Sequence, residues 1–564
     1  MSACKRAPSL LFTAVRNTNQ KPSIRKVTVE ICRYNRRTQP YSTWIKRSSS
    51  WSHKSRITSN VLLAATVAAA SLAVGTRPAY AEEPSDSNKR RLIRLAEVHA
   101  HGPGADSIWV TKGTNVYDIT DWVPSHPGGE VILRAAGGSI DPYWKIFSIH
   151  QKQDVYDILE QYLIGTIDPQ DLVDGQVPSE HVPNPFASDP ERDPRLRMHS
   201  ERPCNAETPA SELGTFITPN EVFYVRNHLW VPDLGNPEDY NLTIELYDGK
   251  EKKYTLQDLR DKFQEHTITA TLQCSGNRRS HMTANARMTN GLQWDVGAIG
   301  NAEWTGVRLR DVLADAGYPV DDIPKDVKHV QFSAVEAYGA SIPIAKAADR
   351  FGDVLLAYKM NGEALPPDHG FPLRALVPGN VAARSVKWVN KITLSDEESP
   401  SQWQRRDYKC FGPNEGPNPN WDAARSIQEM PVQSAITSLR QVSSHSPQAR
   451  KWMHVYGLEE DSVLLEGYAF SGGGREIIRV DISADDGRSW HQAELLEAET
   501  KGSKAWAWRR WRFIIPNSQA GKVFVVKAVD EAYNTQPDSY EPHFNFRGNL
   551  TSGWQRVENK PIPS

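Results

Sequence analysis

The stretch Asp121-Trp122-Val123-Pro124-Ser125-His126-Pro127-Gly128-Gly129 decides the fold of the first globular region of this chain. Pro127 keeps a helix from incorporating His126, and the two glycines after it allow the backbone to approach a flat ring system closely. A second histidine, His150, follows 24 residues later, after the run YWKIFSI at 143–149. Two histidines can bind one iron from both faces, which leaves no open coordination position. The pattern therefore predicts a domain that carries haem and transfers electrons.

The segments around these histidines predict a small α+β domain. Alternating residues over 109–119 predict a β-strand, and residues 130–136 and 154–162 predict short helices. With the HPGG motif, this order resembles the cytochrome b5 family over about 80 residues. The resemblance implies an α+β haem domain over 88–167, with haem b held by His126 and His150.

The charge of the chain is unevenly distributed. Residues 1–81 hold fourteen Lys and Arg and one acid, Glu30, whereas the whole chain has a net charge of −2. The remainder therefore carries about −15, which argues against nucleic acid as a partner and favours a basic protein.

The basic leader has the composition of a mitochondrial presequence. Residues 1–58 are rich in Arg, Lys, Ser and Thr, and an apolar run follows from Val61 to Val74. This run is too short to span a bilayer comfortably. We therefore expect residues 1–81 to be a mitochondrial presequence with an apolar sorting segment. The expected location is the intermembrane space, with no stable membrane span in the mature protein.

Two further boundaries divide the rest of the chain. Residues 168–194 are rich in proline and acids and lack apolar periodicity, which predicts a flexible linker. Turn residues at 414–426 mark a second boundary.

A β-rich domain is predicted over 425–564. Strand-like alternation with hairpin turns suggests an immunoglobulin-like β-sandwich. Trp506 and Trp508 share one parity and Trp511 and Phe513 the other, so a strand cannot keep all four on one face unless a β-bulge intervenes near Arg509-Arg510.

One cysteine lies in a segment that indicates metal chemistry. The five cysteines form no disulfide framework and no C-x-x-C pair. Cys274 lies in TLQCSGNRR, residues 271–279, and a thiolate is a soft ligand suited to a transition metal. Cationic donors are concentrated in FYVRNH at 223–228, DHGFPLR at 368–374 and SVKW at 385–388. Arginine and histidine beside glycine-rich backbone can bind a phosphate-bearing cofactor.

Together these segments resemble the sulfite oxidase family of molybdenum–pterin enzymes, from about Pro194 to the C-terminus. The resemblance implies a mixed α+β molybdopterin domain over 195–424. It also implies that the C-terminal β-domain mediates homodimerisation. The expected architecture is thus an α+β multidomain chain.

The resemblance also assigns roles to single residues. Cys274 matches the protein ligand of molybdenum, and Cys410 is given no role. The match to the cofactor site comprises Tyr224, Val225, Arg226, Asn227, His228, Cys274, Glu336, His369, Arg374, Ser385, Val386 and Lys387. The match to the catalytic anion pocket comprises Arg226, Cys274, Arg279, Trp294, Tyr408 and Arg547.

The function implied by the resemblance is the oxidation of sulfite to sulfate at a molybdenum–molybdopterin centre. Electrons would pass singly through the haem to a basic carrier such as cytochrome c. One alternative is a nitrate reductase-like molybdoenzyme, which the N-terminal position of the haem domain disfavours. The other is a haem-carrying electron-transfer protein with a non-catalytic large domain, which the Cys274–Arg279 segment disfavours.

Overall fold

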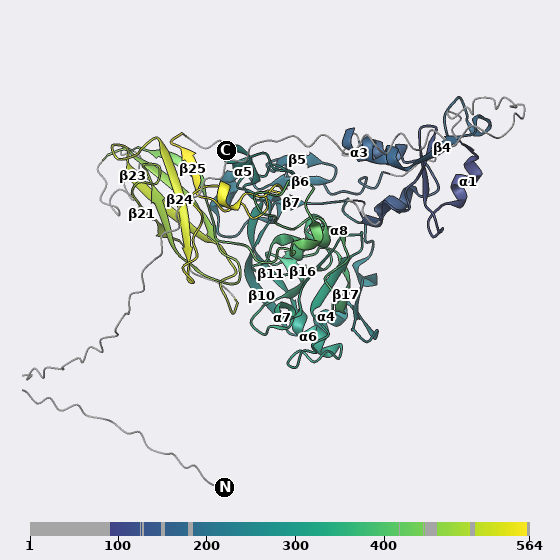
Figure 1. Ribbon diagram of the computed structural model, residues 1–564. Helices are drawn as coiled ribbons and strands as arrows, with labels where there is room; N and C mark the ends of the chain where they lie inside the picture. Colours follow the sequence, from purple (N-terminus) through teal and green to yellow (C-terminus); the bar gives the residue numbers. More distant parts are fainter. Residues whose placement is uncertain are drawn as a thin grey trace, which may run out of the picture. The chain divides into compact units, whose positions relative to one another are not determined.

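A computed structural model describes residues 91–123, 126, 129–147, 150, 153–178, 184–416, 418–443, 445, 460–496 and 502–560 (Figure 1). The predicted presequence, residues 1–81, therefore lies outside the described residues, as do Pro127 and Gly128 of the HPGG motif. Within the described ranges, no helix is long and apolar enough to cross a membrane.

The haem domain is a four-stranded sheet, ordered β1-β4-β3-β2, with short helices. Its elements are β1 (Leu92–Ile93), α1 (Leu95–Ala100), β2 (Trp109–Lys112), β3 (Asn115–Asp118), the 3-10 helix η2 (Gly129–Ala135), α2 (Asp141–Ile146), α3 (Gln153–Leu159), η4 (Glu160–Tyr162) and β4 (Leu163–Ile167). The single strand predicted over 109–119 is wrong. Gly113 adopts a φ of 55°, which turns the chain back and pairs Lys112 with Asn115 in a hairpin.

The described residues of the predicted linker contact folded domains. After η5 (Pro169–Asp171), the Asp171 carboxylate accepts hydrogen bonds from Arg94 Nη2 at 2.6 Å and from Leu95 N at 2.7 Å. At the other end, Asp189 accepts from Val231 N at 2.9 Å and from Arg192 Nη2 at 2.8 Å. Arg94 and Leu95 belong to the haem domain and Val231 to the large domain, whereas Arg192 lies within the predicted linker itself.

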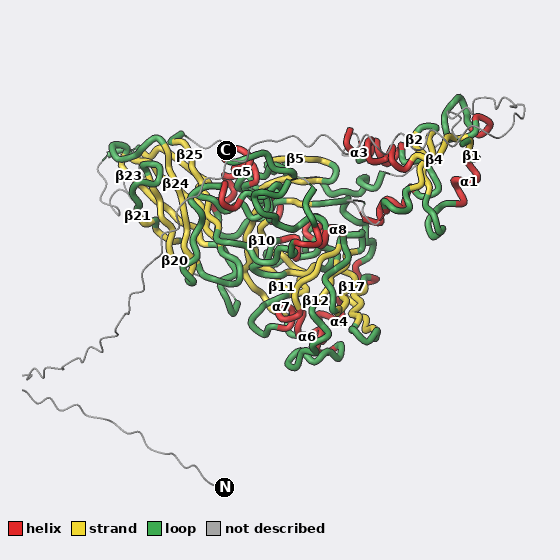
Figure 2. Tube along the Cα trace, in the orientation of Figure 1, coloured by secondary structure: helices red, strands yellow, loops and turns green. Residues whose placement is uncertain are grey.

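The large domain contains three sheets (Figure 2). The first sheet is ordered β10-β11-β14-β15, with β16 paired to β14, and the second is ordered β13-β12-β17-β8-β9. The third is β5-β6-β7. Their bounds are β5 (Arg197–Glu201), β6 (Cys204–Glu207), β7 (Val225–Arg226), β8 (Asn241–Glu245), β9 (Glu251–Thr255), β10 (Glu265–Gln273), β11 (Ile299–Arg308), β12 (His329–Ala334), β13 (Gly339–Pro343), β14 (Leu355–Met360), β15 (Glu363–Ala364), β16 (Arg374–Leu376) and β17 (Val389–Ser395).

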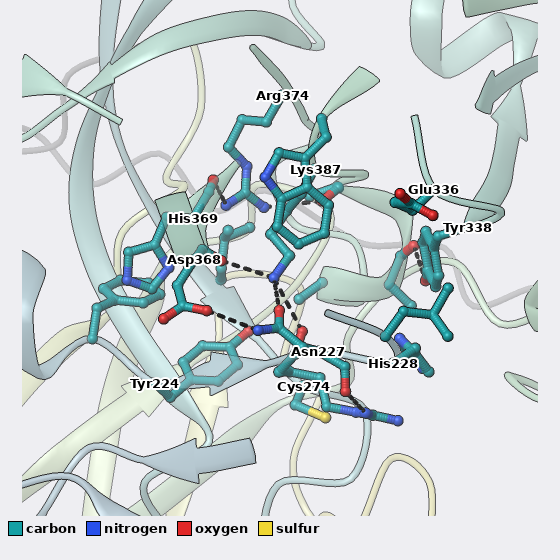
Figure 3. Close-up of a pocket in the computed structure, with 18 of the residues that line it drawn as sticks. Tyr224, Asn227, His228, Cys274, Glu336, Tyr338, Asp368, His369, Arg374 and Lys387 are labelled. Atoms are coloured by element: carbon teal, nitrogen blue, oxygen red, sulfur yellow. Dashed lines mark hydrogen bonds between the residues drawn. The ribbon is translucent and has the colours of Figure 1, made fainter. Parts of the chain in front are cut away.

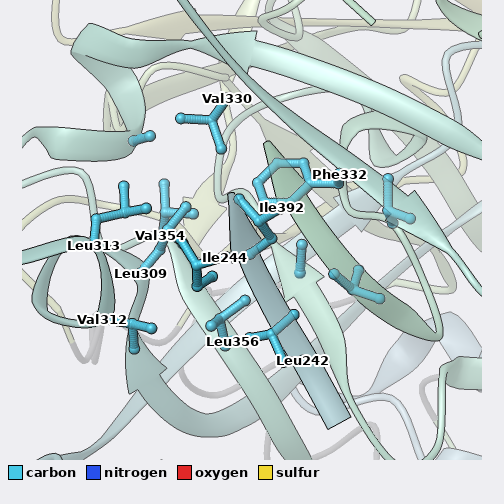
Figure 4. Close-up of a cluster of buried hydrophobic side chains, with 14 of the residues drawn as sticks. Leu242, Ile244, Leu309, Val312, Leu313, Val330, Phe332, Val354, Leu356 and Ile392 are labelled. Carbon is cyan, nitrogen blue, oxygen red and sulfur yellow. The ribbon is translucent and has the colours of Figure 1, made fainter. Parts of the chain in front are cut away.

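The helices of this domain are short. They are η6 (Ala210–Gly214), η7 (Asn220–Val222), η8 (Pro237–Asp239), α4 (Leu256–Lys262), α5 (Arg279–Asn285), α6 (Leu309–Asp315), α7 (Ile344–Ala348), η9 (Pro367–His369), η10 (Ala382–Arg384), α8 (Gln402–Arg405) and η11 (Trp421–Ala423). Side chains from both large sheets and from α6 meet in one buried core, which includes Leu242, Ile244, Val330 and Leu356 (Figure 4). The same core includes Leu373, Ala375 and Val386, which flank Arg374, Ser385 and Lys387 in the sequence.

The C-terminal domain is β-rich, as expected, and its two four-stranded sheets share one core. One sheet is ordered β18-β19-β23-β22 and the other β21-β20-β24-β25. Their bounds are β18 (Gln433–Val442), β19 (Ser462–Phe470), β20 (Ile477–Ser483), β21 (His491–Gln492), β22 (Glu494–Leu495), β23 (Arg509–Pro516), β24 (Val523–Asp530) and β25 (Gln555–Glu558), with η12 (Glu541–His543) between the last two strands. Ile436 and Leu465 of the first sheet pack with Val480 and Phe524 of the second.

No β-bulge interrupts the described strand near Arg509-Arg510. Strand β23 begins at Arg509 and pairs with β19 without a register shift through Pro516. Trp506 and Trp508 precede the strand, and the Trp506 ring joins a core of the large domain. Since these two tryptophans lie outside the strand, their parity places no constraint on its register.

Candidate active site

The loop that carries Cys274 is fixed by the end of β10 and the start of α5. Cys274 N donates to Ala298 O at 2.9 Å, and Asn277 N donates to Cys274 O at 3.0 Å. Arg278, immediately before α5, adopts a left-handed conformation with φ 63°. The loop therefore reverses tightly and leaves the Cys274 side chain, 6% exposed, beside the pocket described next.

A cavity lined by polar and charged side chains opens at this loop (Figure 3). Eleven of the residues predicted for the site line it: Tyr224, Arg226, Asn227, His228, Cys274, Glu336, His369, Arg374, Ser385, Lys387 and Tyr408. The structure thus brings together segments separated by up to 184 residues of sequence.

The other five predicted residues do not line the cavity. The side chains of Val225 and Val386 are buried in hydrophobic cores. Trp294 packs in one core with Cys274 and makes an edge contact with His199 at 4.8 Å between ring centroids. Arg279 interacts electrostatically with both Cys274 and Arg547, and each of the two guanidinium groups disfavours the positive charge of the other.

Lys387 and its partners form one end of the cavity. Its Nζ donates to Asp368 O at 2.8 Å, to Arg226 O at 3.2 Å and to Asn227 Oδ1 (Figure 3). Asn227 Nδ2 in turn donates to Asp368 Oδ1 at 2.8 Å. Burial lowers the pKa of Lys387 to about 7. An anion bound beside Lys387 would offset this cost and favour the charged amine.

Arg374 and His369 provide a second group of cationic or donor side chains. Arg374 donates only to carbonyl oxygens, those of His369 and Ser385 at 2.9 Å and that of Ala375 at 3.4 Å. Burial lowers the pKa of Arg374 to about 10 and that of His369 to about 3. A buried guanidinium without a carboxylate partner is costly unless a ligand supplies the negative charge. This end of the cavity therefore fits a phosphate-bearing cofactor.

Arg226 and Tyr408 also line the cavity, and both interact electrostatically with Cys274. Arg226 Nη1 donates to Asn227 O at 2.7 Å and to Asn205 Oδ1 at 3.0 Å. Burial acts to lower the pKa of Arg226, but the neighbouring Tyr408 and Cys274 outweigh it and the pKa is raised. The Tyr408 hydroxyl lies 3.0 Å from His228 Nε2, and burial raises the pKa of Tyr408.

Arg279 and Arg547 add further positive charge behind Cys274. Burial lowers the pKa of Arg279 to about 10. Arg547 forms an ion pair with Asp407, but its buried Nε has no hydrogen-bond partner among the described residues. Within the same residues, Arg226 and Arg279 form no ion pair with any carboxylate. The buried Arg279 and the half-buried Arg226 and Arg547 together fit a small oxyanion.

Sequence reasoning missed several residues of the site. Asp368 links Arg192 to Asn227, because its carboxylate accepts from Arg192 Nε at 2.8 Å. Its position in the DHGFPLR segment was the available signal. Trp230 and Tyr338 also line the cavity, but single aromatic residues carry no signal that distinguishes them from core.

The two histidines predicted to bind haem face one another. The rings of His126 and His150 are nearly parallel, with an interplanar angle of 7° and centroids 6.1 Å apart. Nitrogen–metal bonds of about 2 Å on each side, plus the ring radii, give roughly this spacing. Trp144 stacks on His150 at 5.4 Å. The pair therefore fits an iron held from both sides.

Comparison with known proteins identifies three regions. Residues 94–168 match the cytochrome b5-like heme/steroid binding domain, 228–403 the oxidoreductase molybdopterin binding domain, and 424–561 the Mo-co oxidoreductase dimerisation domain. The chain is 44% identical over 474 residues to sulfite oxidase of Gallus gallus, which covers 82% of this chain and 98% of that protein. It is 45% identical to mitochondrial sulfite oxidase of Homo sapiens, over 82% and 83% of the two chains.

The fold is also similar to a solved structure. The sulfane dehydrogenase SoxCD of Paracoccus pantotrophus superposes with a TM-score of 0.51 at 28% identity. The match covers 67% of this chain and 90% of that one.

Proposed function

Because the chain belongs to the sulfite oxidase family, we propose that it oxidises sulfite to sulfate at a molybdenum–molybdopterin centre and passes the electrons through a b-type haem. The observation that carries the proposal is that two guanidinium groups, the half-buried Arg226 and the buried Arg279, both interact electrostatically with the Cys274 thiol. When bound, the molybdenum group accepts the two electrons released as sulfite and water become sulfate and two protons, and the haem accepts electrons singly.

The cofactor would be held by the cationic end of the cavity. Lys387 and Arg374 supply charge, and His369 supplies a neutral imidazole, since burial lowers its pKa to about 3. The remaining predicted cofactor contacts are Tyr224, Asn227, His228, Glu336 and Ser385, which line the cavity, together with the backbone of Val225 and Val386. Cys274 supplies the protein thiolate to molybdenum.

Sulfite would bind between Arg226 and the cations behind Cys274. Only Arg226 Nη1 is used in hydrogen bonds to the protein, so Nε and Nη2 can donate to substrate oxygens. Arg547 offers its unpartnered Nε. The Tyr408 hydroxyl keeps its proton, because burial raises its pKa, and can donate to the same anion. Trp294 closes the pocket with apolar surface against Cys274.

The acceptor we propose is cytochrome c. Residues 90–194 hold sixteen acids and eight Lys and Arg, and such a surface attracts a basic carrier. The basic leader and the mitochondrial relative support a mitochondrial location, and a cytochrome c acceptor makes the intermembrane space the matching compartment. The C-terminal domain matches a dimerisation domain, so the protein is proposed to be a homodimer, with an immunoglobulin-like arrangement of its two sheets.

Steady-state reduction of cytochrome c by sulfite tests this function. The purified protein, loaded with molybdenum and haem, should reduce cytochrome c only when sulfite is added. The rate should fall as salt is raised, since salt screens the acidic surface. Nitrate should neither be consumed nor reoxidise the haem. A loaded protein that reduces nitrate but leaves sulfite unchanged would favour the nitrate reductase alternative.

A further inference from the structure

A loop of the C-terminal β-domain closes over the active-site cysteine loop. Leu550 N donates to Ser275 O at 2.7 Å, and Arg279 Nε donates to Arg547 O at 2.8 Å. The two loops are therefore joined at Ser275 and at Arg279, both of which follow Cys274 closely in the sequence.

Asn549 lies at the centre of this junction and is 1% exposed. Its Oδ1 accepts from Ser275 Oγ at 2.9 Å and from Arg279 Nη2 at 3.2 Å. Its Nδ2 donates to Lys409 O at 3.2 Å. Asn545 fixes the backbone of Asn549, because Asn545 Oδ1 accepts from Asn549 N at 3.0 Å and its Nδ2 donates to Asn549 O at 2.9 Å. The amide oxygen is thus held against Arg279.

The Arg279 guanidinium is held in one orientation by close contacts with Leu292, Gly276 and Gly291. Its Nη1 donates to Leu292 O at 2.7 Å. A Cβ atom added at Gly276 would lie 2.6 Å from Arg279 Nη2, and one added at Gly291 would lie 2.8 Å from Nη1. Three of the five N–H groups of Arg279 donate to the protein, which leaves one on each terminal nitrogen for a ligand.

We propose that Asn549 is a positioning residue that orients Arg279 toward the substrate anion while leaving its positive charge unpaired. The inference rests on the proposed function, in which Arg279 contributes to sulfite binding. An amide oxygen is neutral, so it fixes the direction of the guanidinium without competing for its charge. A carboxylate at the same place would hold Arg279 equally well but would neutralise it.

Kinetics of Asn549→Ala test the proposal. Loss of one of the three bonds that orient Arg279 should raise KM for sulfite about tenfold and change kcat less than about threefold. Binding can also be followed without turnover, as the rise in melting temperature caused by sulfate. This rise should be smaller in Asn549→Ala than in the unmodified protein at the same sulfate concentration.

Asn301→Ala is the matched control. Asn301 is fully buried and likewise uses both its amide oxygen and its amide nitrogen, accepting from Thr271 Oγ1 at 3.0 Å and donating to Phe216 O at 2.9 Å, but it does not bond to Arg279. It should lower the melting temperature while leaving KM and the sulfate response unchanged. Equal changes in KM for the two variants would overturn the positioning role.

Asn549→Asp separates orientation from charge, and it remains informative if the alanine variant does not fold. The carboxylate keeps an acceptor for Arg279, so the fold should persist, but KM should rise and sulfate should stabilise the protein less. An unchanged KM in Asn549→Asp would contradict the claim that a neutral acceptor is needed. If the unmodified protein does not oxidise sulfite, the proposed function fails instead, because that result does not depend on Asn549.

Discussion

Replacement of Arg226 by glutamine should weaken sulfite binding more than it slows the chemical step. Burial acts to lower the pKa of Arg226, but Tyr408 and Cys274 raise it by more. The guanidinium therefore carries its charge throughout the neutral range. Its Nε and Nη2 are not used by the protein. Glutamine removes the charge and these two donors while keeping a side chain of similar polarity.

The magnitude follows from the loss of a charge-assisted hydrogen bond. Such a bond contributes about 1.5–3 kcal/mol, which corresponds to a rise in KM of roughly ten- to a hundredfold. Sulfate inhibition should weaken in parallel, because the product carries the same charge. The assay is steady-state cytochrome c reduction over a wide range of sulfite, with the melting temperature measured for each variant.

The control is Arg260→Gln, which removes the same charge from the exposed face of α4. It should leave both KM and sulfate inhibition unchanged. If Arg226→Gln has the KM of the unmodified protein at full cofactor loading, Arg226 does not contact the substrate and the anion pocket is assigned wrongly.

Three further predictions test separate parts of the account. Cys274→Ser should abolish sulfite oxidation but keep the haem spectrum and much of the pterin cofactor, so full activity in a molybdenum-loaded variant would exclude the thiolate ligand. His126→Ala or His150→Ala should stop cytochrome c reduction but spare transfer to an artificial acceptor that takes electrons at molybdenum, and loss of both activities together would refute the relay. His543→Gln should reduce acid sensitivity. His543 Nε2 accepts from the N–H groups of Ser552 and Gly553 at 3.2 and 3.3 Å, and burial lowers its pKa to about 4 from 6.5. The folded state therefore excludes a proton that the unfolded chain binds, and stability is lost as the pH falls from 6.5 to about 4, by up to about 3 kcal/mol. If the melting temperature of the glutamine variant falls with pH as steeply as that of the unmodified protein, His543 does not cause the loss of stability in acid.

Short sequence motifs were sufficient to predict His126 and His150 as the haem ligands and Cys274 as a candidate metal ligand. The HPGG motif and His150 lie close together, and a short apolar run between them limits how they can be arranged. Cys274 is followed within five residues by two arginines, which distinguishes it from an ordinary buried cysteine. Both inferences needed only residue type and short spacing.

The contacts that could not be predicted join residues that are far apart in the sequence. Lys387 and Asn227 are 160 residues apart in the sequence and meet only in the folded domain, which no local pattern encodes. Asn549 was not predicted, since an asparagine in a loop is usually a turn residue. Trp506 and Trp508 precede strand β23, so their spacing in the sequence carries no information about the register of that strand.

Anaerobic addition of sulfite to the purified, cofactor-loaded protein tests the central claim most directly. The haem spectrum and the sulfate produced would be followed together, without any external acceptor. The account predicts that sulfite reduces the haem, that two electrons are recovered for each sulfate formed, and that Cys274→Ser leaves the haem oxidised. A loaded protein whose haem stays oxidised in sulfite, or whose Cys274→Ser variant reduces haem at the same rate, would contradict it.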